Sequence, residues 1–100
     1  MAEFVGPCTG TPVILCADDF GISPSVSRAI VRLASAGRLS ATSCMVTYPN
    51  SAEDIATHDL TSIDVGLHFT MTQAPPVSSA ARDFFGERFP NSKEIFLLGL

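Results

Sequence analysis

The stretch Pro12-Val13-Ile14-Leu15-Cys16-Ala17-Asp18-Asp19 decides the fold, because a short apolar run in it ends on two adjacent carboxylates. An uninterrupted apolar run of this length is typical of a strand in a parallel sheet, where both faces are buried. We therefore predict the first strand at residues 12–17. Asp18 and Asp19 are then expected directly after this buried strand.

Strands and helices are predicted to alternate after this point. Ser23 offers an N-cap hydroxyl to a helix that ends at Gly37. A second strand is predicted at residues 41–47, a short helix at 51–58 and a third strand at 65–70. Alternation on this scale implies right-handed crossovers and a parallel sheet. The predicted fold class is α/β, with the order β-α-β-α-β.

The C-terminal part is predicted to be a long loop followed by one helix. Residues 73–81 are polar and rich in proline, which is typical of a functional loop. Residues 91–98 form the last predicted helix. Three parallel strands leave open edges that a complete domain would pair or cover. We therefore expect residues 1–100 to be a single partial domain, apparently truncated, with a flexible lead at residues 1–11.

Composition and charge exclude several classes of protein. Of the 100 residues, 46% are hydrophobic and 16% are charged, and the mean hydropathy is +0.31. These values are typical of a globular domain with more apolar surface than it can bury, so a second copy of the chain could complete the open sheet edge. The net charge of -4, without a cluster of Lys and Arg, argues against nucleic acid as a partner.

No membrane or export signal is found in the sequence. The longest unbroken apolar run, residues 13–17, is far shorter than the roughly 20 residues of a membrane span. The first residues lack the basic and apolar regions of a signal peptide. Cys8, Cys16 and Cys44 are odd in number and form no C-x-x-C pair. We expect reduced thiols in a cytoplasmic protein, with Cys16 and Cys44 as small core residues.

The candidate site lies where the predicted strands end. Asp18 and Asp19 follow the first strand, and His68 lies near the end of the third. In parallel α/β folds the active site is built at the carboxyl ends of the strands. Two adjacent carboxylates there need a cation, a proton or strong hydrogen bonds. Asp oxygen and His nitrogen are ordinary ligands of zinc or another divalent ion.

Structural roles are the alternatives for these residues and for others. The Asp pair could simply cap the turn, and His68 could be a core or surface histidine. His58 suits the end of a short helix. Gly21 and Gly66 are expected to serve tight backbone geometry. Packing is the simplest role for the phenylalanines of the C-terminal part, although those near Gly86 could line a substrate cleft; the four are Phe84, Phe85, Phe89 and Phe96.

The sequence resembles the YdjC-like carbohydrate deacetylase family, also called the ChbG/HpnK family. The resemblance is carried by residues 14–23 (ILCADDFGIS), by residues 43–46 (SCMV) and by residues 65–72 (VGLHFTMT). It implies a (β/α) barrel-like fold and a hydrolase that removes N-acetyl groups from amino sugars or oligosaccharides. It also implies one divalent metal ion, Mg or Zn, and an acetylated amino-sugar substrate.

The resemblance assigns roles to three residues. It implies that Asp19 and His68 are metal ligands and that Asp18 is the catalytic base. A further metal-binding histidine of the family lies in a later segment, and His58 matches it in neither position nor context. The chain is therefore expected to hold part of the site.

Two other interpretations remain open at this point. One is a catalytically incomplete fragment, or a binding or assembly module of the same fold. The other is a receiver-like signalling domain, in which an acidic pair after the first strand binds magnesium. A receiver needs an acceptor Asp at the end of the third strand, where this sequence has His68. It also needs a lysine after a later strand, whereas the only lysine of this sequence, Lys93, lies in the last predicted helix. The sequence therefore disfavours the receiver.

Overall fold

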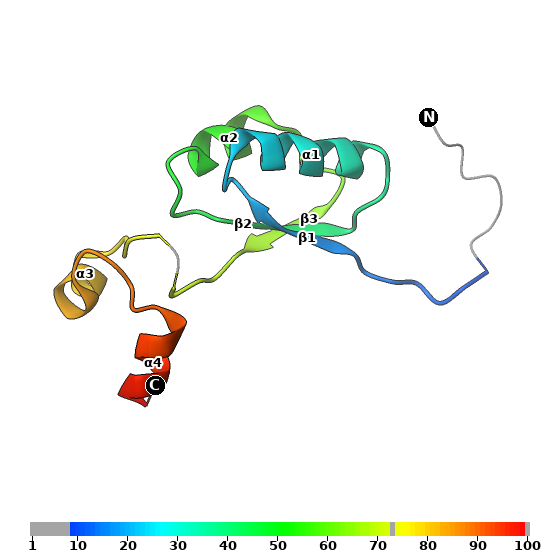
Figure 1. Cartoon of the computed structure of the whole chain (residues 1–100). Coiled ribbons are helices and arrows are strands. Elements are labelled where there is room, and N and C mark those ends of the chain that lie inside the picture. The colour runs from blue at the N-terminus through cyan, green and yellow to red at the C-terminus, as the bar shows by residue number, and fades with distance from the viewer. Residues whose placement is uncertain (1–8, 73, 100) are drawn as a thin grey trace.

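The computed structural model describes residues 9–72 and 74–99 of the chain. Its strands are β1 (Cys16–Phe20), β2 (Ala41–Cys44) and β3 (Asp64–Leu67), and its helices are α1 (Pro24–Ser35), α2 (Ser51–Thr57), α3 (Ser79–Phe85) and α4 (Ser92–Leu98). Strands and helices alternate through β3, as the sequence predicts, and the chain then continues into two short helices (Figure 1).

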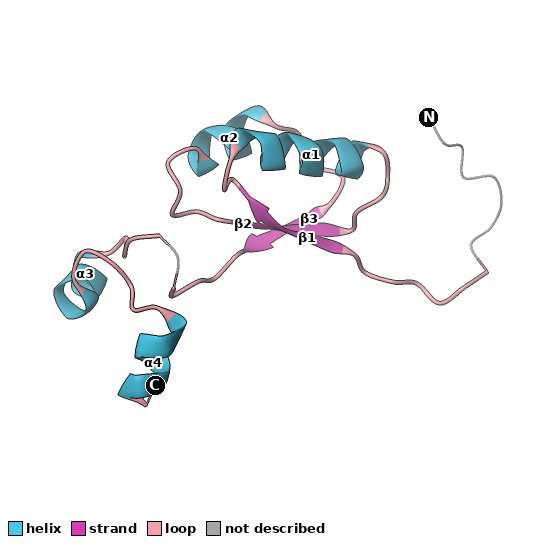
Figure 2. Cartoon of the chain, in the orientation of Figure 1, coloured by secondary structure: helices cyan, strands magenta, loops and turns pink. Residues whose placement is uncertain are grey.

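The three strands form one parallel sheet in the order β1-β2-β3. Both crossover helices, α1 and α2, lie on the same face of this sheet, and no described helix covers the other face (Figure 2). In a doubly wound receiver domain β1 lies between β2 and β3. Here β2 is central, so the receiver interpretation is wrong. The α/β class and the parallel sheet are confirmed.

The core lies between the sheet and the two crossover helices. Phe20 and Met45 are fully buried at 0% exposure, and Ile30, Cys44 and Leu60 are also buried. Burial raises the pKa of the Cys44 thiol, which suits the predicted core role for that residue. Cys16, in contrast, is exposed, so the core prediction is wrong for it. Cys8 lies outside the described residues.

Helix α1 begins and ends as predicted. The Ser23 hydroxyl accepts a hydrogen bond from the Val26 amide at 3.3 Å, and Pro24 occupies the first helical turn. Gly37, at φ +67°, follows the last turn and donates its amide to the Ala34 carbonyl. The N-cap and the glycine stop are therefore both confirmed.

The first strand starts later than predicted and includes the acidic pair. β1 begins at Cys16, whereas Val13 and Ile14 are 80% and 81% exposed. The Leu15 carbonyl still accepts hydrogen bonds from the amides of Ser40 and Ala41. No described strand or helix buries residues 12–14, because β1 is an edge strand of the described sheet with one covered face. An apolar run in the sequence does not show whether a neighbouring strand or helix buries it.

Other predicted boundaries also change. β2 and β3 stop at Cys44 and Leu67, three residues earlier than expected. α2 begins without a side-chain cap, since the N-cap is Asn50 and makes no side-chain cap bond. α3 begins inside the predicted loop, where the Ser78 hydroxyl accepts a hydrogen bond from the Ala81 amide at 3.1 Å. Gln73, the first residue of that predicted loop, lies outside the described residues.

The molecule is elongated, with α3 and α4 set apart from the sheet (Figure 1). The radius of gyration is 17.3 Å, against about 13 Å for a compact domain of this length. Phe96 is 83% exposed, so the packing role predicted for it is wrong, whereas the Phe84 ring, although 79% exposed, packs edge-on against Phe85 with the ring centroids 4.8 Å apart. None of the helices in the described residues has the length and apolar character that a bilayer crossing needs. Most of the predicted lead lies outside the described residues.

Candidate active site

Four polar side chains meet at the carboxyl ends of the three strands. Asp18 and Asp19 belong to β1, Ser43 belongs to β2, and His68 directly follows β3. Parallel strands place these ends along one edge of the sheet. Residues 25 and 49 positions apart in the chain are thereby brought within contact distance.

A β-bulge turns both carboxylates toward this edge. Ala17 pairs with Thr42 and Phe20 pairs with Cys44, so Asp18 and Asp19 together face a single residue of β2. In a regular strand adjacent side chains point to opposite faces. Here Asp19 adopts a left-handed backbone at φ +72°, which re-aims its side chain. The strained residue is thus one that the sequence singles out as a metal ligand.

The four side chains form one connected network. The Ser43 hydroxyl donates to Asp18 Oδ1 at 2.7 Å, and the Cys16 thiol lies 3.8 Å from the same oxygen. His68 Nδ1 lies 3.1 Å from Asp19 Oδ1 and 3.2 Å from Ser43 Oγ. The side chains of Asp19 and His68 are 45% and 26% exposed, so an ion or a substrate can reach them. The structure brings the three residues singled out by the sequence together.

The donors at this edge fit one divalent ion. Ligands bound at about 2.1 Å to a common ion stand roughly 3.0–3.4 Å apart, and Asp19 Oδ1 and His68 Nδ1 are separated by 3.1 Å. An imidazole nitrogen is a typical ligand of Zn, and a carboxylate oxygen is a ligand of both Zn and Mg. Within the described ranges no three His, Cys, Asp or Glu side chains gather to hold an ion. The described residues thus bring two such donors, Asp19 and His68, to this separation.

His58 is not part of this cluster. It forms the C-cap of α2, and its ring packs edge-on against Phe20 with the ring centroids 6.2 Å apart. Phe20 belongs to the core beneath the crossover helices. This position agrees with the structural role predicted for His58.

A buried hydrogen-bond relay fixes the turn after the acidic pair. The Gly21 amide donates to Ser27 Oγ at 3.0 Å, and the Ser27 hydroxyl donates to Asp54 Oδ2 at 2.6 Å. Gly21 has φ +90°, and a Cβ there would stand 2.8 Å from Ser51 Cβ. The predicted need for glycine is confirmed at Gly21. It is wrong at Gly66, where an added Cβ would meet nothing within 4 Å.

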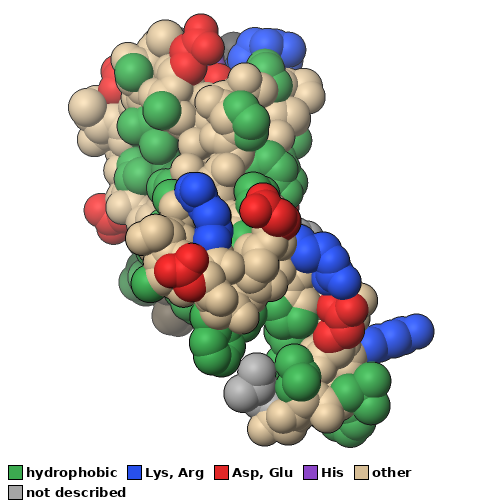
Figure 3. Space-filling model, turned by 90° about the vertical axis from the view of Figure 1, so that its left-hand side faces the viewer, with side chains coloured by type: hydrophobic (Ala, Val, Ile, Leu, Met, Phe, Trp, Pro, Cys, Tyr) green, Lys and Arg blue, Asp and Glu red, His purple; other side chains and the backbone are tan. Residues whose placement is uncertain are grey.

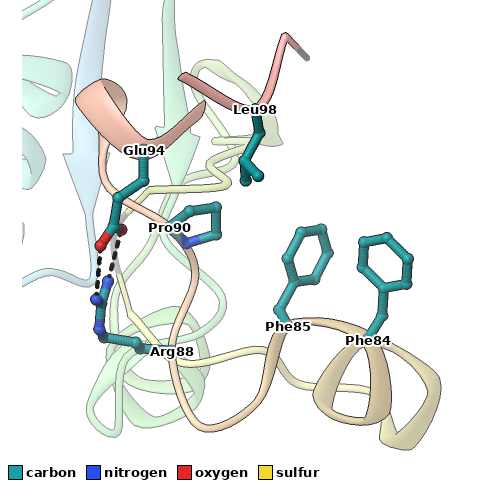
Figure 4. Close-up of a pocket in the computed structure, with 6 residues that line it drawn as sticks. All are labelled: Phe84, Phe85, Arg88, Pro90, Glu94 and Leu98. Carbon is teal, nitrogen blue, oxygen red and sulfur yellow. Dashed lines mark hydrogen bonds and ion pairs between the residues drawn. The ribbon is translucent and has the colours of Figure 1, made fainter. Parts of the chain in front are cut away.

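A hollow lies between α3 and α4, away from the acidic pair. Its volume is about 540 Å³, and Figure 4 shows two phenylalanine rings and an ion pair along it; the lining residues are Phe84, Phe85, Arg88, Pro90, Glu94 and Leu98. Hydrophobic side chains are spread over this side of the molecule and gather at its lower end (Figure 3). Phe84 and Phe85 therefore do line a hollow, and whether it receives substrate stays a prediction.

The ion pair in this hollow joins Arg88 and Glu94. Arg88 donates two hydrogen bonds to the Glu94 carboxylate at 2.9 and 3.0 Å. These bonds, with one from the Asn91 amide, lower the pKa of Glu94 to about 2. Both side chains lie at the surface, so the pair orders the α3–α4 connection rather than building a reactive centre.

Sequence reasoning missed Ser43 as a member of the site. The signal was present in the strand pattern, since Thr42 and Cys44 are buried and Ser43 between them must face the other way. What the pattern lacked was the bulge, which moves Asp18 opposite Ser43. The partnership follows only from the register of the two strands.

The chain is similar to known proteins in sequence and in fold. The model of the YdjC-like protein family matches residues 12–93. A carbohydrate deacetylase of Thermoanaerobacter pseudethanolicus is 30% identical over 89 residues, and the match covers 80% of this chain and 36% of that protein. A crystal structure of an Enterococcus faecalis protein named for cellobiose-phosphate cleavage superposes with a TM-score of 0.69 at 26% identity, over 80% of this chain and 34% of that one.

The two relatives are much longer than this chain, whereas the family match spans most of it. The chain spans about a third of the length of both the deacetylase and the E. faecalis protein. The family match, in contrast, takes in β1 to β3 and every residue of the acidic cluster. This chain belongs to the YdjC-like protein family.

Proposed function

We propose that this chain carries part of the active site of a metal-dependent carbohydrate deacetylase, which removes N-acetyl groups from amino sugars or oligosaccharides. The observation that carries the proposal is the convergence of Asp18, Asp19 and His68 at one edge of the sheet. The similarity to a protein named carbohydrate deacetylase supports the choice of substrate. The reaction adds water across the amide bond and releases acetate and a free amine.

The sheet suits the start of a (β/α) barrel. Its order is β1-β2-β3, and successive helices lie on one face. In such a barrel every crossover is right-handed, helices form the outer ring, and the opposite face of the sheet points inward. The open face would then be the barrel interior, and the acidic cluster would lie at its catalytic end.

Asp19 and His68 are the residues that would hold the ion, Mg or Zn. Asp19 Oδ1 and His68 Nδ1 are already 3.1 Å apart, so neither side chain has far to move. The strained backbone at Asp19 keeps its carboxylate at this edge. A divalent ion bound there supplies a Lewis acid for the acetyl carbonyl.

Asp18 is the proposed general base. Its Oδ1 accepts the Ser43 hydroxyl at 2.7 Å and faces the Cys16 thiol at 3.8 Å. Its Oδ2 accepts no hydrogen bond from the described residues, so this oxygen is free to take the proton of the attacking water. Holding Oδ1 fixes the direction in which Oδ2 points.

A second candidate, a binding or assembly module, is favoured by one observation. Large apolar side chains are exposed at both edges of the sheet, with Val13 and Ile14 beside β1 and Val65 and Leu67 in β3. An uncovered edge with apolar side chains is a site for strand pairing. A chain that binds no divalent ion and forms a stable dimer through these edges would support this candidate instead.

Two matched variants test the deacetylase proposal. Asp19→Asn keeps a side chain that tolerates a left-handed backbone but weakens the negative donor, so we expect zinc affinity to fall more than about 100-fold. Asp18→Asn should leave zinc affinity within about threefold and lower acetate release by about 100-fold or more. Isothermal titration and an acetate assay with an N-acetylated chitin disaccharide measure the two effects. Equal loss of zinc affinity in both variants would reject the division of roles.

A further inference from the structure

We infer that Ser43 is a positioning residue that fixes Asp18 and His68 relative to each other. The inference builds on the proposed function, in which these two side chains supply the base and a metal ligand. Ser43 Oγ is the one atom within hydrogen-bond distance of both, at 2.7 Å from Asp18 Oδ1 and 3.2 Å from His68 Nδ1. No other side chain in the described residues bridges the two.

The chemistry of the hydroxyl sets the direction of both hydrogen bonds. A hydroxyl carries one proton, and an ionised carboxylate can only accept. The Ser43 proton therefore goes to Asp18, in a short charge-assisted bond. Only the lone pairs of Ser43 Oγ remain for His68, and Asp19 Oδ1 at 3.1 Å is also an acceptor. The described groups that face Nδ1 are therefore acceptors, so Ser43 Oγ can hold the His68 ring by accepting a hydrogen bond from it while it donates to Asp18.

The position of Ser43 suits this role. It lies in the central strand, which is paired on both sides, with β1 and with β3. Its own register partner is Gly66, and the bulge of β1 lies on the other side. The strand is therefore held in place more firmly than either edge strand that carries the reacting side chains. The Ser43 hydroxyl on this central strand can therefore hold Asp18 and His68 at fixed positions.

The chain offers matched controls for the hydroxyl. Ser43→Ala removes it, and Ser43→Thr retains it in the β-branched form that strands accommodate well. Thr42→Val removes the hydroxyl of the neighbouring residue, which donates to the Ala17 carbonyl at 2.7 Å on the covered face. That variant loses a β1–β2 hydrogen bond of the same length without touching the site.

The test combines ring spectroscopy of the ion-free chain with zinc titration. Nitrogen NMR distinguishes the two ring nitrogens, and the chain has only two histidines, so His58 is an internal reference. We expect the Nδ1 signal of His68 to shift in Ser43→Ala and to stay near its parent position in Ser43→Thr, with Asp19 still beside the ring in both variants. Zinc affinity should fall about tenfold in Ser43→Ala, because the ring is then no longer held beside Asp19 before the ion binds, and return to within about threefold of the parent in Ser43→Thr.

The controls separate failure of this inference from failure of the proposed function. Thr42→Val should lower the melting temperature while leaving the His68 signals and zinc affinity unchanged. Unchanged His68 signals in Ser43→Ala would overturn the inference, as would equal loss of zinc affinity in Thr42→Val and Ser43→Ala. If the parent chain binds no zinc, the proposed function fails, and the spectra of the ion-free chain still decide the role of Ser43.

Discussion

The sheet with its two crossover helices and the C-terminal pair of helices differ in how their helices are stabilised. α4 has a complete capping box, formed by Asn91 and Glu94, yet it buries no residue. α2 has no side-chain cap bond, yet it buries Ser51 and Asp54 against the turn after β1. Local signals are therefore strongest where packing is weakest. The difference teaches that capping can define a short helix, while only a packed face ties it to the rest of the fold.

The two regions also differ in how they use charge. In the sheet region carboxylates are held by hydroxyl groups, as in the bonds from Ser43 to Asp18 and from Ser27 to Asp54. In the C-terminal region the main charged contact is an exposed ion pair between Arg88 and Glu94. A neutral hydroxyl that donates to a carboxylate does not cancel its negative charge, so the carboxylate can still bind an ion or accept a proton. A guanidinium carries a positive charge that offsets it. This contrast favours the sheet edge as the reactive part.

The largest expected effect compares a phenylalanine from each region. Phe20→Ala removes a ring that is 0% exposed and should lower the free energy of unfolding by about 3–5 kcal/mol. Phe96→Ala removes a ring that is 83% exposed and should change it by less than about 0.5 kcal/mol. Urea denaturation followed by circular dichroism measures both. Similar losses in the two variants would show that α4 packs on a core after all.

A smaller effect is expected from two glycines with left-handed backbones. Gly21→Ala would place a Cβ 2.8 Å from Ser51 Cβ at φ +90°, so we expect a loss of about 3 kcal/mol. Gly86→Ala also strains the backbone, at φ +79°, but its Cβ would meet nothing within 4 Å. It should therefore leave unfolding of the sheet region unchanged. A transition lowered equally by both variants would contradict the independence of the two regions.

The smallest expected effect is a pH dependence of the ion pair between Arg88 and Glu94. The pKa of Glu94 is lowered to about 2 in the folded chain by bonds from Arg88 and the Asn91 amide, from an ordinary value of 4.5. A carboxyl with a depressed pKa stabilises the folded form above its ordinary pKa, and this contribution is lost as the pH falls from about 4.5 toward 2. Carbonyl NMR of Glu94 measures the midpoint. A midpoint near 4.5 would show that the ion pair does not persist.

Much of the fold could be predicted from local sequence. The Ser23 N-cap, the Gly37 stop and the alternation of strands and helices through residue 67 all follow from short-range preferences. The edge at which Asp18, Asp19 and His68 meet also follows from a general property of parallel sheets. These features depend on neighbours within a few residues or on the fold class alone.

The remainder depends on contacts that no local pattern encodes. β1 pairs only with β2 among the described strands, and Val13 and Ile14 before it are exposed. The bulge that aims Asp19 at His68 is a property of the pairing with β2. The partnership of Ser43 with Asp18 follows from that same register. Tertiary pairing, rather than propensity, therefore fixes the geometry of the candidate site.

The central claim is that the bulge of β1 and the end of β3 together hold one divalent ion. Anomalous diffraction from crystals soaked separately in zinc and manganese tests it most directly. The account predicts a peak within bonding distance of both Asp19 Oδ1 and His68 Nδ1, whose present separation is 3.1 Å. A map with no peak at this edge, and with the Asp19 and His68 side chains turned apart, would contradict it.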